Sequence, residues 1–211
     1  MQFYTVSDTP RPVRLCETTR KFAYDSLHYQ YGKDTWKTPN VILEDSDLPE
    51  CASLIDKYDA AIKKIAETAP IRICKEERIS GAATLGDAMR HYVPALYKGE
   101  YICFSVSHLT TDFKTVIEEG YSGLFERAKK SLAAYSGTDR ERFLKSAILV
   151  LRSFETYHKR YLAALENRAD KQENYRNLLR VPAFGATNFF EAVQSLWFTF
   201  SFKIFFTLYK R

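Results

Sequence analysis

The stretch Tyr101-Ile-Cys-Phe-Ser-Val-Ser-His-Leu-Thr-Thr-Asp-Phe-Lys-Thr-Val-Ile-Glu-Glu-Gly120 combines an apolar run, a histidine and the start of a helix. Its first six residues, 101–106, are mostly β-branched or aromatic, which predicts a short covered strand. Thr111 or Asp112 then offers a side-chain oxygen to the first free amides of a helix. Gly120 is expected to end this helix in a left-handed conformation, because a residue without a Cβ adopts it at little cost.

His108 lies at the junction between this predicted strand and the helix. In α/β proteins such junctions carry residues that contact ligands, because a rigid scaffold aims them at a crevice. The residues alone leave two interpretations of His108 open: a side chain that binds a substrate, and a side chain satisfied by local hydrogen bonds. Asp112 is better explained as the helix cap than as a binding residue.

The overall composition is that of an ordinary soluble globular protein. The chain has 211 residues, of which 45% are hydrophobic and 27% are charged, enough for one good core or two small ones. Its net charge of +5 arises from 31 basic and 26 acidic residues that are mixed along the chain. Nucleic-acid binding is not expected, because recognition of a phosphate backbone requires a concentrated basic patch.

Four cysteines, Cys16, Cys51, Cys74 and Cys103, lie far apart in the sequence. They form no Cys-x-x-Cys pair and have no histidines at zinc-binding spacing, so no metal site is expected. No apolar segment follows a positively charged N-terminus, so we expect no secretory signal. These features favour a cytoplasmic protein with free thiols.

Hydrophobic periodicity and capping residues predict a mainly helical chain. Asp47 with Glu50 resembles a capping box before an apolar stripe, and Asp139 is the expected cap of the longest helix. Asn188 with Glu191 marks the start of the last helix. The predicted helices cover residues 13–31, 47–69, 111–120, 122–135, 139–169, 175–179 and 188–209, with a helical turn at 87–95, and the predicted strands cover 71–74 and 101–106.

The helix predicted after Asp139 is long for a chain of this size. Its apolar face continues for about 26 residues, or roughly 40 Å at the helical rise. A compact globule of this chain length is only about 43 Å across. Such a helix would cross the whole molecule, which suits a larger protein better.

The last predicted helix becomes apolar on all sides towards its end. From Phe198 to Tyr209, eight of twelve residues are apolar or aromatic. Leaving four such side chains in water would forfeit about 8 kcal/mol, comparable with the whole stability of a typical domain. Three explanations are open: a membrane helix over 192–209, which Lys203 disfavours; an interface with a partner; or the first part of a longer protein that covers the helix.

Two passages resemble the glycyl radical enzymes. The first is Ser107-His-Leu-Thr-Thr-Asp-Phe113 with Gly120-Tyr-Ser-Gly123, and the second is Val181-Pro182 followed by Phe190-Glu-Ala-Val-Gln-Ser-Leu-Trp-Phe198. From about Arg11 to Phe202 the chain looks like the N-terminal part of the pyruvate formate-lyase-like domain. The resemblance implies a mainly α fold with a few short strands, as the N-terminal helical part of a glycyl radical enzyme α/β barrel.

In this family a glycine radical, installed by a separate radical S-adenosylmethionine activating enzyme, oxidises a central cysteine to a thiyl that attacks the substrate. The radical loop of most members, Arg-Val-x-Gly-Tyr, does not occur in this sequence. Arg180-Val-Pro-Ala-Phe-Gly185 resembles it only superficially and lies in the wrong part of the chain. Cys74-Lys-Glu76 matches the family's Cys-x-Glu pattern by chance, because it lies among charged residues and the family's cysteine lies much further along the chain. No catalytic residue, cofactor-binding residue or metal ligand is therefore assigned.

In some family members the strand before the Asp-aromatic pair contributes a polar side chain that contacts the substrate, and His108 occupies the matching position. The resemblance therefore implies His108 as the substrate-binding residue. A histidine rather than an arginine at this place favours a diol, an amine or another small polar substrate over pyruvate.

We therefore expect an N-terminal fragment of an enzyme that cleaves a C–C, C–O or C–N bond of a small polar substrate, and expect it to be inactive alone. Its expected division is an arm over 1–12, a partial pyruvate formate-lyase-like domain over 13–202 and a divergent tail over 203–211. The implied partners are the substrate and the activating enzyme of the full-length family, with a homodimer left open and no membrane expected. The alternative is a non-enzymatic helical interaction or assembly module that uses its aromatic C-terminal helix.

Overall fold

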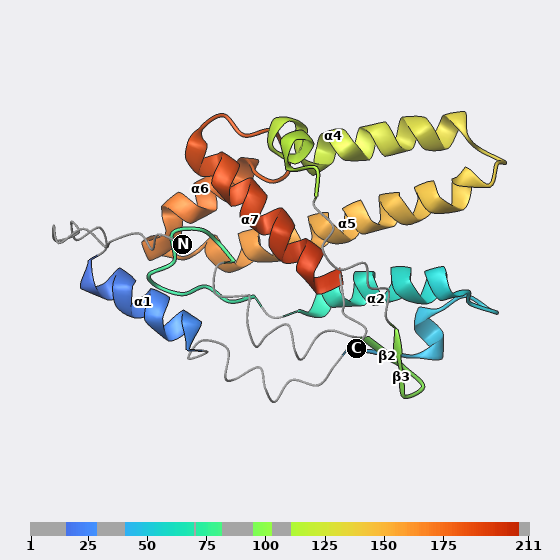
Figure 1. The fold of residues 1–211 in the computed structure, drawn as a ribbon, viewed down its shortest axis with the longest axis horizontal. Helices are drawn as coiled ribbons and strands as arrows, with labels where there is room; N and C mark the ends of the chain where they lie inside the picture. The colour runs from blue at the N-terminus through green and yellow to red at the C-terminus, as the bar shows by residue number, and fades with distance from the viewer. Residues whose placement is uncertain (1–15, 29–40, 70, 82–94, 103–110, 207–211) are drawn as a thin grey trace, which may run out of the picture.

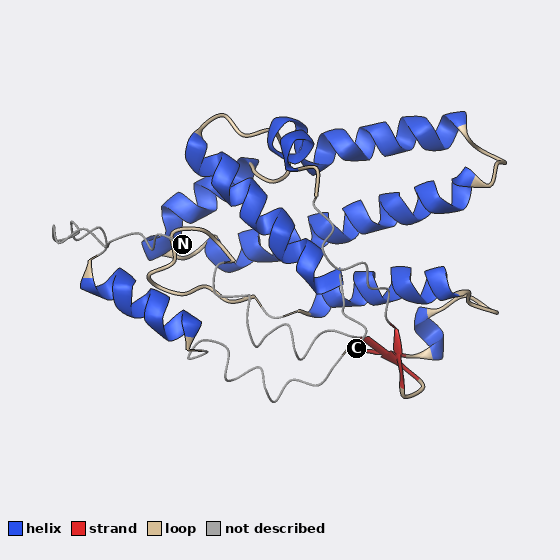
Figure 2. Ribbon diagram, in the orientation of Figure 1, coloured by secondary structure: helices blue, strands red, loops and turns tan. Residues whose placement is uncertain are grey.

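The computed structural model describes residues 16–28, 41–69, 71–81, 95–102 and 111–206. Within these ranges helices dominate, and the strands form one small sheet at one end of the molecule (Figure 2). The expectation of a mainly α fold with a few short strands is confirmed.

The helices are α1 (Glu17–Leu27), α2 (Leu54–Thr68), α4 (Phe113–Ala134), α5 (Arg140–Leu165), α6 (Gln172–Arg180) and α7 (Phe189–Phe206), with the short 3-10 turns η2 (Asp45–Asp47) and η3 (Ala169–Lys171). The strands are β1 (Ile42–Leu43), β2 (Ala95–Tyr97) and β3 (Glu100–Ile102). Helix α5 is central: α4 packs against one side of it and α2 against another, while α7 crosses the layer and contacts α4 and α6 (Figure 1).

The sheet has the order β1-β2-β3, with β1 parallel to β2 and β2 antiparallel to β3. Lys98 and Gly99 connect β2 to β3 with φ values of 50° and 81°, the positive values that a tight two-residue hairpin turn requires. The predicted strand over 101–106 thus starts one residue earlier, and its part beyond residue 102 lies outside the described residues. The predicted strand over 71–74 is wrong, because those residues are irregular.

Helix α2 begins later than the sequence pattern predicts. Its capping box is formed by Ser53 and Asp56. The Ser53 amide donates to the Asp56 carboxylate, and the Asp56 amide donates to the Ser53 hydroxyl. Asp47 instead caps η2, where its carboxylate accepts from the Glu44 amide at 2.8 Å. The chain cannot be helical through Cys51, whose φ is 54°. The predicted Asp47 and Glu50 capping box is therefore wrong.

The apolar stripe of α2 is buried as predicted, with Ile62 and Ile65 facing the core. The polar side of the same helix is tied to α5 by Arg142, whose guanidinium donates to Asp56 at 2.6 Å and to Asp59 at 2.8 Å. These two charge-assisted hydrogen bonds fix the register of α2 on α5.

Helix α4 contains a break at Gly120, where the sequence predicts the end of a short helix. Gly120 has φ 69° and ψ 179°, so φ is positive as expected. The residue is not in the left-handed helical region, because its ψ is extended; only glycine adopts this combination without strain. The chain resumes a helix directly after it and continues to Ala134.

Helix α5 has 26 residues, the length predicted for its apolar face, and ends at Leu165 rather than at 169. Asp139 precedes it, but its side chain forms no capping hydrogen bond with the described residues, so this predicted cap is wrong. The backbone of Asp139 is already helical, with φ −58° and ψ −24°, whereas an N-cap residue whose side chain bonds the first amides is typically extended.

The predicted cap of α7 is confirmed, since the Asn188 side chain accepts from the Glu191 amide at 3.0 Å. Two aromatic residues of this helix, Phe198 and Phe202, are covered without a membrane or a partner. Both are buried against α5, where Phe198 is packed among the rings of Phe154 and Tyr161. The helix therefore completes a core formed by this chain itself.

The remaining predicted elements differ mainly in their ends. The helix predicted over 13–31 is observed as α1, and the flanking residues 1–15 and 29–40 lie outside the described ranges. The short helix over 175–179 is observed as the longer α6. Of the helical turn predicted over 87–95, only Ala95 is described, and it lies in β2. Among the described helices, none is long and apolar enough to cross a membrane.

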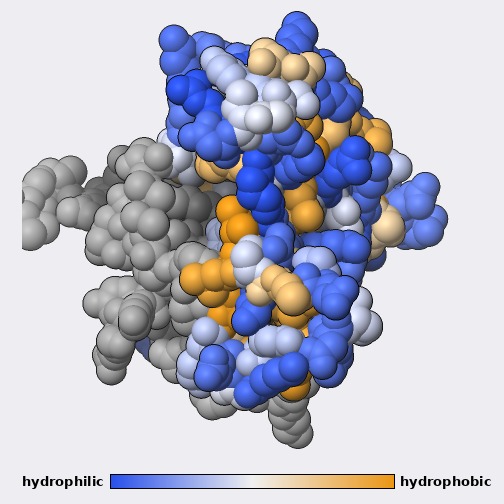
Figure 3. Space-filling view, turned by 90° about the vertical axis from the view of Figure 1, so that its right-hand side faces the viewer, coloured by the Kyte–Doolittle hydropathy of each residue, from blue (hydrophilic) through white to orange (hydrophobic). Residues whose placement is uncertain are grey.

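Some large hydrophobic side chains remain at the surface. On the face shown in Figure 3, hydrophobic residues gather near the centre, with hydrophilic residues above, below and to the right of them. Leu54 at the start of α2, Phe143 in the first turn of α5 and Phe189 at the start of α7 are 59%, 68% and 85% exposed.

Candidate functional site

The expected substrate residue, His108, lies outside the described residues. The structure describes the elements on either side of the stretch that contains it: β3, which ends at Ile102, and α4, which begins at Phe113. The geometry of these flanking elements defines the frame of the candidate site.

Asp112 caps α4, as predicted. Its carboxylate accepts from the Thr115 amide at 3.2 Å and from the Thr115 hydroxyl at 2.6 Å. These two hydrogen bonds lower the pKa of Asp112, with the hydroxyl contributing most. Asp112 therefore stays ionised at neutral pH and fixes the first turn of α4.

The break in α4 brings together the two passages that carry the family resemblance. The Tyr121 and Ser122 amides, freed by the break, donate to the Pro182 and Ala183 carbonyls at 2.9 and 3.0 Å. The loop between α6 and α7 thus supplies the hydrogen bonds that the helix loses at Gly120.

The same loop also touches the turn before the break. The Ala186 amide donates to the Ile117 carbonyl at 2.8 Å. Gly120 and Gly185 permit this approach, since a Cβ at Gly120 would lie 2.4 Å from the Ala183 oxygen and one at Gly185 would lie 2.1 Å from the Glu118 oxygen. We call this contact between α4 and the 181–186 loop the glycine junction.

Side chains of the second motif hold the start of α7 and a distant segment. The Glu191 carboxylate accepts from the Thr187 amide at 2.7 Å and lies 3.7 Å from the Arg180 guanidinium, so it orders the entry into the helix. Gln194, fully buried, accepts from the Ser80 amide at 2.7 Å and donates to the Ser80 carbonyl at 3.1 Å. These two hydrogen bonds hold the segment at Ser80, which is 114 residues from Gln194 in the sequence, against α7.

The segment before Ser80 is held by α6 and the turn that precedes it. Lys171, 3% exposed, donates to the Lys75 and Glu77 carbonyls at 2.6 and 2.7 Å, and burial lowers its pKa. Asn174 donates to the Ser80 hydroxyl at 3.1 Å. Buried donors on two elements thus replace the hydrogen bonds that a strand would have supplied to this irregular segment.

Three hydroxyl side chains of α7 are buried without a hydrogen-bond partner among the described residues: Ser195, Thr199 and Ser201. A buried hydroxyl that stays unpaired costs about 1–3 kcal/mol. Their burial could not be foreseen from the sequence, where they look like interruptions of an apolar helix.

His158 is a buried histidine whose role was not predicted from the sequence. Its Nε2 lies 2.7 Å from the Leu178 carbonyl and its Nδ1 lies 3.1 Å from the Tyr121 hydroxyl, so the ring joins α4, α5 and α6. Burial lowers the pKa of His158 to about 4. The neutral ring donates one proton from Nε2 to the carbonyl and accepts one from Tyr121 at Nδ1.

The depressed pKa predicts an acid-sensitive fold. Between pH 6.5 and 5, His158 becomes protonated in the unfolded chain, where its pKa is about 6.5, but stays neutral in the folded chain, where its pKa is about 4. Stability is therefore present above pH 6.5 and is lost as the pH falls towards 4, by about 2 kcal/mol between pH 6.5 and 5. The measurement is the urea-derived free energy of unfolding at pH 5, 6 and 7.

The matched variant for this prediction is His158→Gln, which keeps hydrogen-bonding groups but does not titrate. Its free energy of unfolding should be lower at pH 7 and should change much less between pH 6.5 and 5. Most carboxylates titrate below this window, so they contribute little to the difference. An equal pH dependence in both proteins would show that His158 is not the responsible group.

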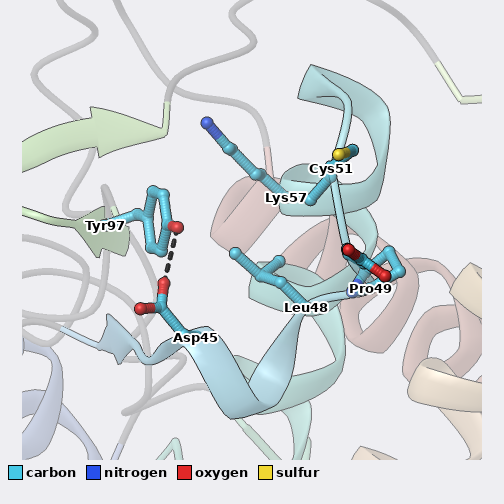
Figure 4. Close-up of a pocket in the computed structure, with 8 residues that line it drawn as sticks. Asp45, Leu48, Pro49, Cys51, Lys57 and Tyr97 are labelled. Atoms are coloured by element: carbon cyan, nitrogen blue, oxygen red, sulfur yellow. Dashed lines mark hydrogen bonds between the residues drawn. The ribbon is translucent and has the colours of Figure 1, made fainter.

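An open pocket of about 560 Å³ lies between η2, the start of α2 and β2. Its charged and aromatic lining comes from Asp45, Glu50, Lys57 and Tyr97, and Leu48 contributes an apolar wall (Figure 4). The Tyr97 hydroxyl donates to Asp45 at 2.7 Å, which is the main reason that the pKa of Asp45 is lowered. No sequence pattern indicates this pocket, because its lining comes from three separate segments.

The cysteines show no active-site arrangement in the described part of the chain. Cys16, Cys51 and Cys74 are free thiols, and Cys103 lies outside the described residues. Burial, with a smaller effect of Glu77, raises the pKa of Cys74 to about 11. The described residues hold no group of His, Cys, Asp and Glu side chains suited to a metal ion.

Comparison with known proteins identifies the fold. Residues 85–205 match the family model described as pyruvate formate lyase-like, which covers both resemblance passages and nearly all of α4 to α7. The chain belongs to this family of glycyl radical enzymes. No curated protein matches the chain significantly.

Two solved structures share the fold over nearly the whole chain. One comes from work on 1,2-propanediol dehydration in Roseburia inulinivorans and has a TM-score of 0.65 at 18% identity over 93% of this chain. The other is the glycerol-bound B12-independent glycerol dehydratase from Clostridium butyricum, with a TM-score of 0.67 at 16% identity over 90% of this chain. The matched region is 33% and 34% of those chains, so this chain spans about a third of their length.

Proposed function

We propose that this chain forms a helical part of a glycyl radical enzyme that cleaves a C–C, C–O or C–N bond of a small polar substrate. The proposal rests on the match of residues 85–205 to the pyruvate formate lyase-like family. The glycine junction supports it, because it brings the two resemblance passages into direct backbone contact.

We propose His108 as the residue that binds the substrate in the complete enzyme. It precedes the firmly capped start of α4, and an imidazole can donate to or accept from a substrate hydroxyl. One of the two similar solved structures concerns 1,2-propanediol dehydration, and the other is a glycerol dehydratase. Small polyols such as 1,2-propanediol and glycerol are therefore the first substrates to test.

The radical chemistry requires groups that the described residues do not supply. A glycyl radical enzyme acts by hydrogen-atom abstraction from its substrate, through a cysteine and a glycine loop. The segment from Arg180 to Gly185, which only partly resembles that loop, has a structural role instead. Arg180 donates to the Gly185 carbonyl at 2.8 Å, and Gly185 packs on the Glu118 backbone. We therefore propose that the chain is inactive alone and needs both an activating enzyme and a polypeptide with the two loops.

We also propose the division into an arm over 1–12, a partial domain over 13–202 and a divergent tail over 203–211, together with a cytoplasmic location; a homodimer is left open. Exposed apolar side chains such as Phe143 and Leu54 support a chain that is covered by further polypeptide.

The alternative, a non-enzymatic interaction or assembly module, needs the aromatic C-terminal helix as its interface. This alternative is weaker, because Phe198 is fully buried and Phe202 is 6% exposed in the chain's own core. These two side chains are not free to contact a partner.

The test is co-expression of the chain with a separate polypeptide that carries the cysteine and glycine loops, followed by anaerobic activation. The activated pair should dehydrate 1,2-propanediol or glycerol. His108→Ala should lower kcat/KM about 100-fold, as loss of a substrate hydrogen bond in a water-excluded site does, with the radical unchanged. His28→Ala, at an exposed position just after α1, is the matched control and should leave activity unchanged. Equal activity of the two variants would refute the role of His108.

A further inference from the structure

Tyr121 connects the glycine junction to the buried ring of His158. Its hydroxyl lies 3.1 Å from His158 Nδ1, and its amide donates to the Pro182 carbonyl at 2.9 Å. Tyr121 is 8% exposed and directly follows the break at Gly120. The same residue therefore contacts the histidine through its side chain and the 181–186 loop through its backbone.

The two hydrogen bonds of His158 require a neutral ring. Nε2 lies 2.7 Å from the Leu178 carbonyl, which can only accept, so Nε2 carries the proton and the bare Nδ1 accepts from Tyr121. Burial raises the pKa of Tyr121, so its hydroxyl stays a donor. A proton added at Nδ1 turns this acceptor into a donor and leaves the proton of the Tyr121 hydroxyl without its acceptor.

The groups around the imidazole ring do not compensate for such a charge. On α5, Glu155 favours the protonated form and Lys159 opposes it. From α4 the ring faces the Tyr121 hydroxyl, from α6 the Leu178 carbonyl, and from α7 the Phe198 ring, whose centre lies 5.7 Å away. No carboxylate in the described part of the chain bonds the imidazole, and burial outweighs the effect of Glu155. The ring therefore stays neutral as long as it is enclosed.

A pocket next to Tyr121 brings solvent close to this contact. It lies between α4 and α5, has a volume of about 190 Å³, and is lined by Tyr121, Ser122, Phe125, Glu126, Leu151 and Glu155. Glu126 is exposed, so the pocket reaches the surface. Because Tyr121 touches the imidazole and also lines the pocket, a displacement of its side chain gives water a short route to Nδ1 without moving α5.

We propose that the glycine junction opens as a pH-sensitive hinge when His158 takes up a proton, while the rest of the helical core stays folded. The Tyr121 side chain leaves the ring, and the 181–186 loop separates from α4. The backbone turns at Gly120, where the missing Cβ permits a wide range of dihedral angles.

The hinge bears on the frame of the candidate site. The first part of α4, residues 113–119, lies between the Asp112 cap and Gly120. A turn at Gly120 changes the direction of this part relative to α5. The proposal does not rest on the radical chemistry of the family, so its failure would leave the proposed function unaffected.

Native-state amide hydrogen exchange of the 211-residue chain, followed by NMR at pH 7 and pH 5, tests the hinge. The reporting amides are those of Tyr121, Ser122 and Ala186, which donate across the junction. The control is the Tyr135 amide, which bonds the Ser131 carbonyl at 2.9 Å at the other end of α4. Each rate is divided by that of an unstructured peptide at the same pH, which gives a protection factor.

The protection factors of the junction amides should be about 20-fold lower at pH 5 than at pH 7. The pKa of His158 is about 4 when the ring is enclosed and returns to about 6.5 when it is exposed, so the closed state is fully favoured above pH 6.5 and loses stability as the pH falls. The Tyr135 amide should be equally protected at both pH values. His158→Gln should remove the pH difference at the junction.

Low concentrations of urea separate the hinge from global unfolding, which also exposes His158. A local opening exposes little surface, so exchange of the junction amides should hardly depend on urea, whereas exchange of the most protected core amides should increase with it.

Four outcomes would overturn the proposal. The junction amides could be as protected and as dependent on urea as the core amides, which would mean that the junction opens only with the whole chain. Their protection could be equal at pH 5 and 7, the Tyr135 amide could show the same pH effect, or the pH effect could persist in His158→Gln. The first three are read in the unmodified protein, so a variant that fails to fold does not remove the test.

Discussion

Gly120→Ala is expected to lower the free energy of unfolding by about 4 kcal/mol. Two effects add at this position. The backbone of Gly120, at φ 69° and ψ 179°, is strained for any residue with a Cβ. The new methyl group would also lie 2.4 Å from the Ala183 carbonyl oxygen and 2.7 Å from the Phe184 Cα, so the glycine junction must open. Urea unfolding followed by circular dichroism measures the loss.

Two further glycines separate the two effects. Gly137, at φ 76°, has nothing within 4 Å of a built Cβ, so Gly137→Ala should cost only about 1 kcal/mol from the backbone. Gly185→Ala has a built Cβ 2.1 Å from the Glu118 oxygen and tests the close approach. The expected order of destabilisation is Gly120, then Gly185, then Gly137. If Gly120→Ala cost no more than Gly137→Ala, the glycine junction would not be a tight contact.

Phe198→Ala is expected to cost about 4 kcal/mol, the other large effect. Phe198 is fully buried, and its ring centre lies between 5.0 and 6.0 Å from those of Tyr161, Tyr157 and Phe154 on α5. Truncation would leave a cavity among large rigid rings that cannot collapse into it. Thermal and urea unfolding of the variant measure the change.

Phe189→Ala is the matched control, since it makes the same substitution on the same helix. Phe189 is 85% exposed, so its removal should change the free energy of unfolding by less than about 0.5 kcal/mol. Equal effects at the two positions would mean that α7 is not docked on α5. In that case the aromatic helix would again be available as an interface for a partner.

The helices could largely be predicted from the sequence because their signals are local. The Asn188 cap, the break at Gly120 and the 26-residue length of α5 each follow from a few neighbouring residues. The capping box at Asp47 failed for a related reason. Several acidic and hydroxyl residues that could cap a helix precede α2. Because Cys51 has a positive φ, the helix cannot run through it, and Ser53 rather than Asp47 is the N-cap.

The contacts that hold the candidate site could not be predicted in this way, because they join distant segments. Gln194 meets Ser80 across 114 residues, and His158 joins Tyr121 to the Leu178 carbonyl. A single sequence contains no local pattern that pairs such residues.

The structure also explains why one motif indicates the family without indicating its chemistry. In the second motif, Glu191 orders the start of α7, Gln194 fastens Ser80 and Phe198 fills the core. All three side chains stabilise the fold in the described part of the chain. The proposed substrate contact rests on His108 alone, which lies outside it.

The central proposal is that this chain is part of a glycyl radical enzyme and is inactive without a polypeptide that carries the cysteine and glycine loops. The most direct measurement is electron paramagnetic resonance of the purified chain after anaerobic incubation with an activating enzyme and S-adenosylmethionine, with and without the polypeptide that carries the cysteine and glycine loops. We expect an organic radical signal and turnover of a diol only when that polypeptide is present. A glycyl radical signal with turnover from the 211-residue chain alone would contradict the claim.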